Sequence, residues 1–264
     1  MQRMQRQASV YKAVFGEPQN PPPYPFYRNS LDSSQSKDMS APPSYHRATN
    51  SLGGLETPSL PKDSLILVTG ANSWQGLHIV DQLLEHGYRV RGAVRDAEKA
   101  VWTSKLFLGK YGAGRYMTAV VPDMVPQGAY DLAARGCSGI IHVASVMSFS
   151  PDPNAVVTPT IAGALNALEA AVKEPLVKRF VYCSSVNAAV SPGSGMRSNV
   201  TSESWNMDSL RPAWELPPYE TGRSWTVFAA SKMQTEQAVW RWYRERRPNF
   251  VLNCGKSYPC VILR

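Results

Sequence analysis

Cysteine, long apolar runs and a tyrosine four residues before a lysine are scarce or missing in this sequence. Only four cysteines occur among 264 residues, and no two form a C-x-x-C pair. This argues against a disulfide framework and a zinc site, so we expect reduced thiols and no metal. No run of 18 apolar residues exists, so we predict no membrane association. None of the ten lysines follows a tyrosine at the spacing of one helical turn.

Charge of either sign is also scarce. Charged residues make up 18% of the chain, and the net charge is +8. The densest basic cluster lies near the end of a predicted helix, where cations suit the helix dipole; it consists of Arg241, Arg244, Arg246 and Arg247. We therefore expect a solvated surface and no nucleic-acid binding.

The first 61 residues differ in composition from the rest. They contain nine of the 21 prolines and no apolar run long enough to pack, so residues 1–61 are predicted to be a disordered arm. Residues 1–15 carry three basic and no acidic side chains, which leaves a mitochondrial presequence as the alternative to the cytoplasmic location that we expect. Two segments fit Pro-Pro-x-Tyr, which WW domains bind, and predict a WW-domain partner: Pro21-Pro22-Pro23-Tyr24 and Pro42-Pro43-Ser44-Tyr45.

From Leu65 onward, buried strands alternate with amphipathic helices. Repeated strand-helix-strand units predict an α/β fold, a Rossmann-type doubly wound parallel sheet over residues 62–253. A loop rich in Ser, Pro and Gly is predicted at 191–222. The predicted strands are 65–69, 88–94, 116–121, 139–144 and 180–183, with a sixth beginning at 250. The predicted helices are 77–84, 96–110, 127–134, 161–172 and 229–246.

A glycine turn joins the first predicted strand to the first helix. In this context backbone N–H groups and the helix dipole can meet a pyrophosphate. Ser73 takes the middle position of the usual three glycines; it fits if its φ stays negative, and its hydroxyl then either contacts phosphate or weakens binding. The predicted cofactor residues of the turn are Thr69, Gly70, Asn72, Ser73, Trp74, Gln75 and Gly76.

Residues after the second and third strands indicate which dinucleotide binds. An arginine at the end of the second strand suits the 2′-phosphate of NADP(H), whereas a carboxylate there suits NAD. Arg95 is the main candidate, with Lys99 and Arg91 as secondary ones. Asp123 follows the third strand, where an adenine contact is expected, although an Asp in a loop also shapes turns.

The chain resembles the extended short-chain dehydrogenase/reductases, in the branch of dihydroflavonol reductases and fungal aldehyde and ketone reductases. The resemblance covers roughly residues 65–253. It implies that Val143 and Ala144 contact the cofactor. The motifs that carry it, in family order, are Val68-Thr-Gly-Ala-Asn72, His78-Ile-Val-Asp-Gln-Leu-Leu84, Gly87-Tyr-Arg-Val-Arg-Gly92, Val121-Pro-Asp-Met124, Ile141-His-Val-Ala-Ser145, Gly163-Ala-Leu-Asn-Ala-Leu-Glu-Ala-Ala171, Lys178-Arg-Phe-Val-Tyr-Cys-Ser-Ser185 and Ser231-Lys232.

The resemblance also implies a chemistry and a departure from it. The family reduces small carbonyl compounds with NADPH, using a Ser–Tyr–Lys set to polarise and protonate the oxygen. Ser185 and Lys232 match the serine and the lysine, and Lys232 would also hold the nicotinamide ribose. Phe228 stands where the family has tyrosine. Because phenylalanine has no proton to give, we predict impaired catalysis.

After Asn253 the sequence leaves the family pattern. Relatives continue into a substrate-binding lobe, so residues 254–264 are predicted to be a divergent tail, with that lobe largely missing. Gly255-Lys256-Ser257 is compatible with a splice-donor sequence, which makes a retained intron or a faulty gene model our hypothesis for the tail. Two alternatives to an impaired reductase stay open: a non-catalytic nucleotide-binding or interaction protein, and a poorly folding product whose apolar face is uncovered.

Overall fold

A computed structural model describes residues 58–191 and 199–257 of the chain. All of them belong to one compact unit, Gly54–Arg264. The two Pro-Pro-x-Tyr segments, residues 1–15 and nearly all of the predicted arm lie outside the described residues.

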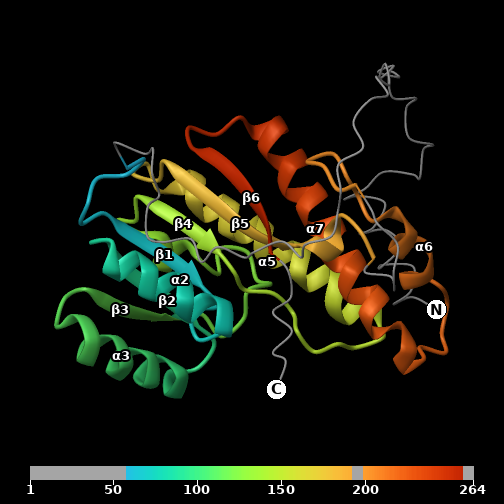
Figure 1. Ribbon diagram of the computed structural model, residues 1–264, viewed down its shortest axis with the longest axis horizontal. Coiled ribbons are helices and arrows are strands. Elements are labelled where there is room, and N and C mark those ends of the chain that lie inside the picture. The colour runs from blue at the N-terminus through green and yellow to red at the C-terminus, as the bar shows by residue number, and fades with distance from the viewer. Residues whose placement is uncertain (1–57, 192–198, 258–264) are drawn as a thin grey trace, which may run out of the picture. The chain divides into compact units, whose positions relative to one another are not determined.

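The described part of the chain forms a six-stranded parallel sheet in the order β3-β2-β1-β4-β5-β6 (Figure 1). This order reverses at β1, as the predicted doubly wound fold requires. The strands are β1 (Leu65–Thr69), β2 (Arg89–Val94), β3 (Tyr116–Val120), β4 (Gly139–His142), β5 (Arg179–Ser185) and β6 (Val251–Ser257). The helices are α2 (Trp74–Glu85), α3 (Ala97–Tyr111), α4 (Asp131–Ala134), α5 (Pro153–Lys173), α6 (Leu210–Ala213) and α7 (Ser224–Arg246).

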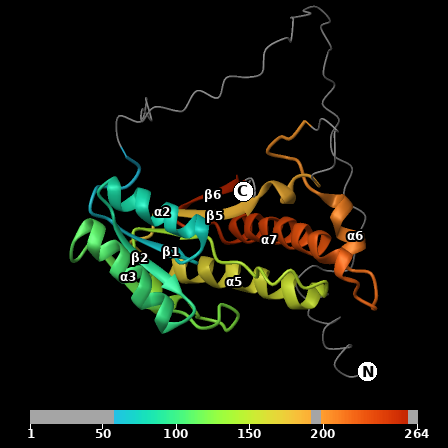
Figure 2. The ribbon, with the colours of Figure 1, turned by 60° about the horizontal axis from the view of Figure 1, so that its bottom comes forward.

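Helices cover both faces of the sheet and create two apolar cores. Alternate residues of β1 point to opposite faces. Ile66 and Val68 pack with α2 and α3, whereas Leu65 and Leu67 pack with α4, α5 and α7. Long helices α5 and α7 run side by side beneath the strands (Figure 2). The strands are buried on both faces, which is why their sequences read as continuous apolar runs.

The structure corrects several predicted boundaries. Leu60 is 9% exposed and packs into the core beside α2 and α3, so the folded part begins before residue 62. The helix predicted at 127–134 is confined to α4. Within the region predicted as a loop, three short helical segments occur: Met207–Ser209, α6 and Thr221–Arg223. Such single turns lack the apolar periodicity that reveals longer helices.

The last strand also extends beyond the predicted domain end at Asn253. β6 pairs in parallel with β5 from Arg179↔Val251 to Ser185↔Ser257. Cys254, Gly255, Lys256 and Ser257 are therefore sheet residues, although they lie in the predicted tail. The backbone of β5 forms hydrogen bonds with this segment whatever its side chains are. The side-chain pattern therefore did not reveal that the strand continues to Ser257.

Helix α5 is long and apolar enough to cross a membrane by length and composition, with a mean hydropathy of 1.4. The most apolar 18-residue stretch of the helix is 61% buried inside the molecule, so its apolar stripe faces the core. The buried stripe is built from small and branched side chains that pack against β4, β5 and α7. Its composition is therefore that of a core helix.

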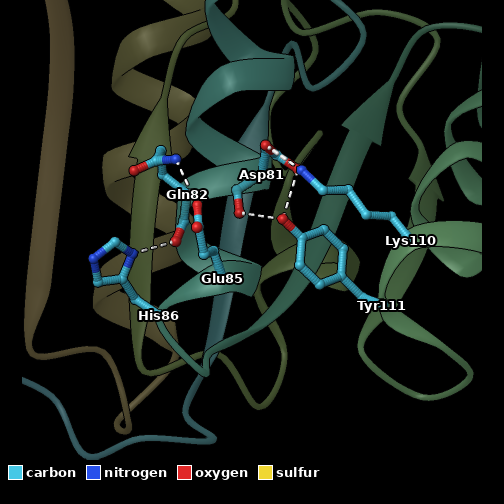
Figure 3. A network of polar contacts seen from close by, with 6 residues as sticks. All are labelled: Asp81, Gln82, Glu85, His86, Lys110 and Tyr111. Carbon is cyan, nitrogen blue, oxygen red and sulfur yellow. Dashed lines mark hydrogen bonds and ion pairs between the residues drawn. The ribbon is translucent and has the colours of Figure 1, made fainter. Parts of the chain in front are cut away.

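A polar network joins α2 to α3 on the outer face (Figure 3). Asp81 accepts hydrogen bonds from the Lys110 ammonium at 2.7 Å and from the Tyr111 hydroxyl at 2.6 Å. Burial raises the pKa of Asp81, but these hydrogen bonds outweigh it, so the pKa lies below its ordinary value.

We expect Asp81→Asn to destabilise the protein at neutral pH, because the amide keeps the shape but loses the charge that Lys110 and Tyr111 bind. A carboxyl with a lowered folded-state pKa stabilises the fold above its unfolded value, near 3.9, and loses that contribution as pH falls through the folded value. The difference between parent and variant in urea unfolding should therefore be present at pH 7 and pH 5, and shrink below about pH 4. A difference that grows as pH falls would contradict it.

Candidate active site

The turn between β1 and α2 brings backbone unusually close to backbone. Gly70 has φ +64°, and a Cβ there would lie 3.1 Å from the Ala144 backbone. A Cβ on Gly76 would collide with the carbonyl oxygen of Gly70. Both positions therefore favour glycine, and α2 begins directly beside the end of β1, where the N–H groups at a helix N-terminus can meet an anion.

Ser73 has the negative φ that a residue other than glycine needs at this position of the turn. Its φ is −78°, so the backbone needs no glycine there. Its Oγ accepts the Gly76 N–H at 3.0 Å and donates to the Gly70 carbonyl at 2.7 Å. The hydroxyl is thus the N-cap of α2, which locks the turn. Its proton is already used within the turn.

The other predicted residues of the turn differ in exposure. Trp74 is 60% exposed, and its ring meets the ring of His78 edge-on with centroids 4.6 Å apart. Asn72 and Gln75 are half-buried. The first turn of α2 contains no acidic side chain, so nothing on the helix itself opposes an anion at its N-terminus.

Thr69 has a different role from the one expected of a cofactor residue. It is completely buried. Its Oγ1 accepts the N–H groups of Val143 and Ala144 at 3.0 and 3.1 Å and contacts His142 Nδ1 at 3.0 Å. One hydroxyl therefore fastens the end of β1 to the segment after β4. Its side chain, like the N–H groups of Val143 and Ala144, is committed to this junction, and it shapes the sheet edge from behind.

Burial and the nearby Lys232 cation lower the pKa of His142 to about 3. The imidazole is therefore neutral at physiological pH. Tyr130 meets it edge-on and Tyr182 stacks on it, with centroids 5.7 and 6.2 Å away. Its Nε2 is buried without a hydrogen-bond partner among the described residues. His142 is a core residue of the junction.

The end of β2 lies beside the glycine turn, since Thr69 pairs with Ala93. Arg95 is exposed. The carboxylate next to it is used elsewhere, because Asp96 Oδ1 accepts the Lys99 N–H at 2.7 Å as the N-cap of α3. Lys99 is also exposed, in the first turn of that helix. Among the described residues, the Arg95 guanidinium and the Lys99 ammonium are thus exposed cations that can meet a phosphate at this edge.

Arg91 is not available to a cofactor, contrary to its standing as a secondary candidate. Its guanidinium donates to the carbonyls of Ala133 and Arg135 at 2.8 and 2.6 Å and contacts Cys137 Sγ at 3.7 Å. It caps the carbonyl end of α4. Asp123, predicted to contact adenine, is exposed, and its Oδ1 accepts the Val125 N–H at 2.9 Å. This hydrogen bond supports the alternative interpretation, in which Asp123 shapes a turn of the loop. The bond uses Oδ1 and does not involve Oδ2.

Ser185 ends β5 at the edge that also carries Gly70. It is 5% exposed, and its Oγ accepts the Asn187 N–H at 3.2 Å. The preceding residue, Ser184, donates to Glu236 Oε2 at 2.5 Å. Because Glu236 lies one helical turn after Lys232 on α7, this bond places the end of β5 beside the predicted lysine.

Glu236 forms a second contact that the sequence did not reveal. Lys256 Nζ lies 3.2 Å from its Oε1 and 4.9 Å from the centre of the Trp205 ring. The side chain of Glu236 is 3% exposed and that of Lys256 is 18% exposed. These contacts form a buried set that joins three elements: Ser184 of β5, Glu236 of α7 and Lys256 of β6.

Lys232 and Phe228 lie together on the buried side of α7. Each is 6% exposed, and Lys232 Nζ is 5.8 Å from the centre of the Phe228 ring. Burial lowers the pKa of Lys232 to about 8, while nearby Cys183 raises it slightly. Phe228 thus occupies the predicted place of the phenol, but it offers the ammonium only the face of its ring.

An aromatic cluster surrounds Phe228 on its outer side. Phe149, from the segment between β4 and α5, and Trp225, one turn earlier on α7, lie with their ring centroids 5.4 Å from that of Phe228. Phe149 and Trp225 are 41% and 55% exposed. The i, i+3 spacing of Trp225 and Phe228 was visible in the sequence. Phe149 was not, because a loop residue carries no periodic signal. The buried hydroxyl of Ser145, unpaired among the described residues, was missed too.

Comparisons with known proteins find relatives of this chain among reductases and epimerase/dehydratases. The chain is 47% identical over 200 residues to aldehyde reductase 2 of Sporidiobolus salmonicolor, covering 75% of this chain and 58% of that protein. It is 41% identical over 194 residues to the NAD-dependent epimerase/dehydratase terH of Aspergillus terreus, covering 74% and 57%. A bifunctional dihydroflavonol 4-reductase/flavanone 4-reductase of Malus domestica is 35% identical over 190 residues, covering 70% and 51%.

A solved structure shows the same fold. The yeast methylglyoxal/isovaleraldehyde reductase Gre2 complexed with NADPH superposes with a TM-score of 0.63 at 25% identity, covering 74% of this chain and 57% of that one. The chain therefore spans somewhat more than half the length of the relatives it matches. The NAD dependent epimerase/dehydratase family matches residues 66–254. The chain belongs to that family of Rossmann-fold proteins, as its resemblance to the extended short-chain dehydrogenase/reductases predicted.

Proposed function

We propose that this chain binds NADP(H) at the carboxyl edge of the sheet and is an impaired member of the aldehyde and ketone reductases. The observation that carries the proposal is the close turn from Gly70 to Gly76, joined to an exposed Arg95 on the neighbouring strand end. A glycine-lined helix N-terminus suits a pyrophosphate, and an arginine suits a 2′-phosphate.

The residues at this edge fit three parts of NADP(H): the pyrophosphate, the 2′-phosphate and the adenine. The remaining N–H groups at the start of α2 would hold the pyrophosphate, and Arg95 would hold the 2′-phosphate. Asp123 is exposed and uses Oδ1 in its own turn, so its other oxygen, Oδ2, would be the atom for the adenine end. When bound, NADPH supplies a hydride to the carbonyl carbon. Ser73 keeps an extended backbone with a negative φ, which fits the turn.

Side chains of this chain then act on the carbonyl oxygen. Ser185 donates a hydrogen bond to it from the end of β5, and Lys232 holds the nicotinamide ribose from α7. Phe228 cannot deliver a proton, so the oxygen must take one from water. A positioned acid commonly contributes about 10²- to 10⁴-fold, so we infer slow reduction of a small carbonyl substrate.

A second candidate function is a nucleotide-binding protein without catalysis. The observation that favours it is that Phe228 packs against the rings of Phe149 and Trp225 and has no group that can transfer a proton. In that case the WW-domain ligands of the amino-terminal segment would provide the function. A protein with either function would bind NADPH. Only the impaired reductase would consume NADPH when a carbonyl compound is added. A cytoplasmic location remains a prediction for either.

Arg95→Ala tests the cofactor assignment. We expect it to weaken NADPH binding by about 10- to 100-fold, since a hydrogen bond to a charged group contributes about 1.5–3 kcal/mol and about 1.4 kcal/mol is tenfold. NADH binding should barely change, because NADH lacks the 2′-phosphate. NADPH fluorescence measures both, with Lys105→Ala, an exposed position on α3, as the control. Equal affinities of the parent for NADPH and NADH would contradict the choice of cofactor, and no binding of either would end the proposal.

A further inference from the structure

The outer face of α3 exposes an unusual amount of apolar surface. The helix packs on β2, β3 and α2, and its buried residues are Ala100, Thr103 and Phe107. Every other described helix or strand carries at most one large apolar side chain that is exposed. A single exposed apolar residue is ordinary, whereas a group of them marks an interaction surface. On α3 such side chains, each between 45% and 54% exposed, are Val101, Trp102, Leu106 and Leu108.

This face lies apart from the candidate active site. α3 packs on β2 and β3, at one end of the strand order, whereas α7 packs on β5, near the other end. Figures 1 and 2 both show α3 and α7 toward opposite edges of the sheet. The exposed side chains of α3 are therefore not a continuation of the aromatic cluster around Phe228.

Two opposite charges flank the middle of this face symmetrically. Glu98 stands three residues before Val101, and Lys105 stands three residues after Trp102. Both charged side chains are exposed, and neither forms an ion pair or a hydrogen bond within the part of the chain that the structure describes. Residues three, four and seven apart share one face of a helix. These four residues therefore form one outward row, with an apolar centre and a charge of opposite sign at each end.

A second copy of the same row complements this pattern. Two-fold symmetry brings residue i of one copy against residue j of the other, and j against i. With the helices antiparallel and the axis between Val101 and Trp102, each Val101 meets the Trp102 of the second copy. The same rotation brings each Glu98 against the Lys105 of the second copy. One arrangement thus covers the apolar centre and pairs all four charges.

Charge also decides between a second copy and a lipid surface. An anionic membrane attracts lysine side chains near it but repels a carboxylate, and Glu98 lies in the same row as Lys105. A second copy neutralises both. A contact between two helices of 15 residues buries less than the roughly 1,200–2,000 Å² of a stable interface, so the association is weak.

We propose that the outer face of α3 is the contact surface of a weak two-fold dimer of this chain. Val101 and Trp102 form its centre, and a Glu98–Lys105 ion pair closes it on each side. The dimer is independent of NADP(H) binding and of carbonyl reduction, because none of these residues has a part in the proposed function.

Sedimentation velocity of the full chain tests the proposal. We expect the mean sedimentation coefficient to rise from the monomer value toward the dimer value between about 5 and 500 µM protein, the range of a weak interface. Trp102→Ser should weaken the association by about tenfold or more, because a central tryptophan carries much of the energy of an interface. Leu132→Ser, at a 72% exposed position of α4, is the matched control and should associate like the parent.

Charge reversal tests how the two helices are oriented. Glu98→Lys and Lys105→Glu should each weaken the association by about tenfold or more, because both ion pairs of the dimer become repulsive. An equimolar mixture of the two variants should associate like the parent, since one presents two cations and the other two carboxylates. Far-UV circular dichroism establishes that each variant is folded before the mixture is measured.

The proposal is overturned by a parent chain that stays monomeric over this range, or by association that Glu98→Lys leaves unchanged. It is also overturned if the mixture of the two folded charge variants does not associate. A monomeric chain that binds vesicles of phosphatidylcholine and phosphatidylserine, and loses this binding in Trp102→Ser, would assign the face to a membrane instead. NADPH fluorescence tests the proposed function separately, so either proposal can fail alone.

Discussion

Phe228→Tyr should raise the rate of NADPH-dependent carbonyl reduction by about 10²- to 10⁴-fold, the usual contribution of a positioned general acid. The new phenol would lie one helical turn before Lys232, on the same buried side of α7. The ammonium would lower the pKa of the phenol and make it a better acid. The rate is measured as loss of NADPH absorbance with a small aldehyde such as methylglyoxal.

Two further variants show whether the gain comes from proton transfer. Phe228→Leu changes the ring without adding a hydroxyl and should stay as slow as the parent. Phe228→Tyr combined with Lys232→Met should lose most of the gain, while NADPH affinity of Phe228→Tyr alone matches that of the parent. A parent chain as fast as Phe228→Tyr would show that the proton comes from another group and that Phe228 is not the missing acid.

Removing Glu236 should have the largest effect on stability. Glu236→Ala leaves Lys256 without its anion and Ser184 without its acceptor, all in a largely buried place. Breaking a buried ion pair from one side costs about 3–5 kcal/mol. Urea unfolding at pH 7, followed by circular dichroism, should therefore show a large shift of the midpoint.

Matched variants identify the cause of that loss. Glu236→Gln retains an oxygen that accepts from Ser184, so it should lose less than Glu236→Ala. Glu245→Ala, at an exposed position of the same helix, should change stability by no more than about 0.5 kcal/mol. If Glu236→Ala behaved like Glu245→Ala, the buried set would not hold the three elements together.

Most of the fold could be predicted from the sequence, for physical reasons that particular elements show. β1 is buried on both faces and reads as an unbroken apolar run, and α2 repeats apolar residues at helical spacing from Leu77 to Leu84. The end of β6 carries no such signal. Its hydrogen bonds come from β5, a partner some 70 residues away in the chain.

The candidate site was predictable where a local turn defines it and unpredictable where distant side chains meet. The negative φ of Ser73 follows from its place as a helix N-cap. The partners of Arg91 were not predictable, because the carbonyls that its guanidinium binds, those of Ala133 and Arg135 at the end of α4, lie more than 40 residues along the chain. Thr69 was assigned to the cofactor from its place in the glycine turn, and its hydroxyl instead accepts the N–H groups of Val143 and Ala144, which follow β4.

The place of Lys256 on β6 has a consequence for how the sheet and α7 fit together. Glu236 on α7 is neutralised by a lysine that belongs to another element, the last described strand. Until β6 docks, that carboxylate must stay hydrated, and α7 cannot close tightly on β5. The packing of α7 against β5, and with it the edge that carries Ser185 and Lys232, therefore depends on β6 being in place.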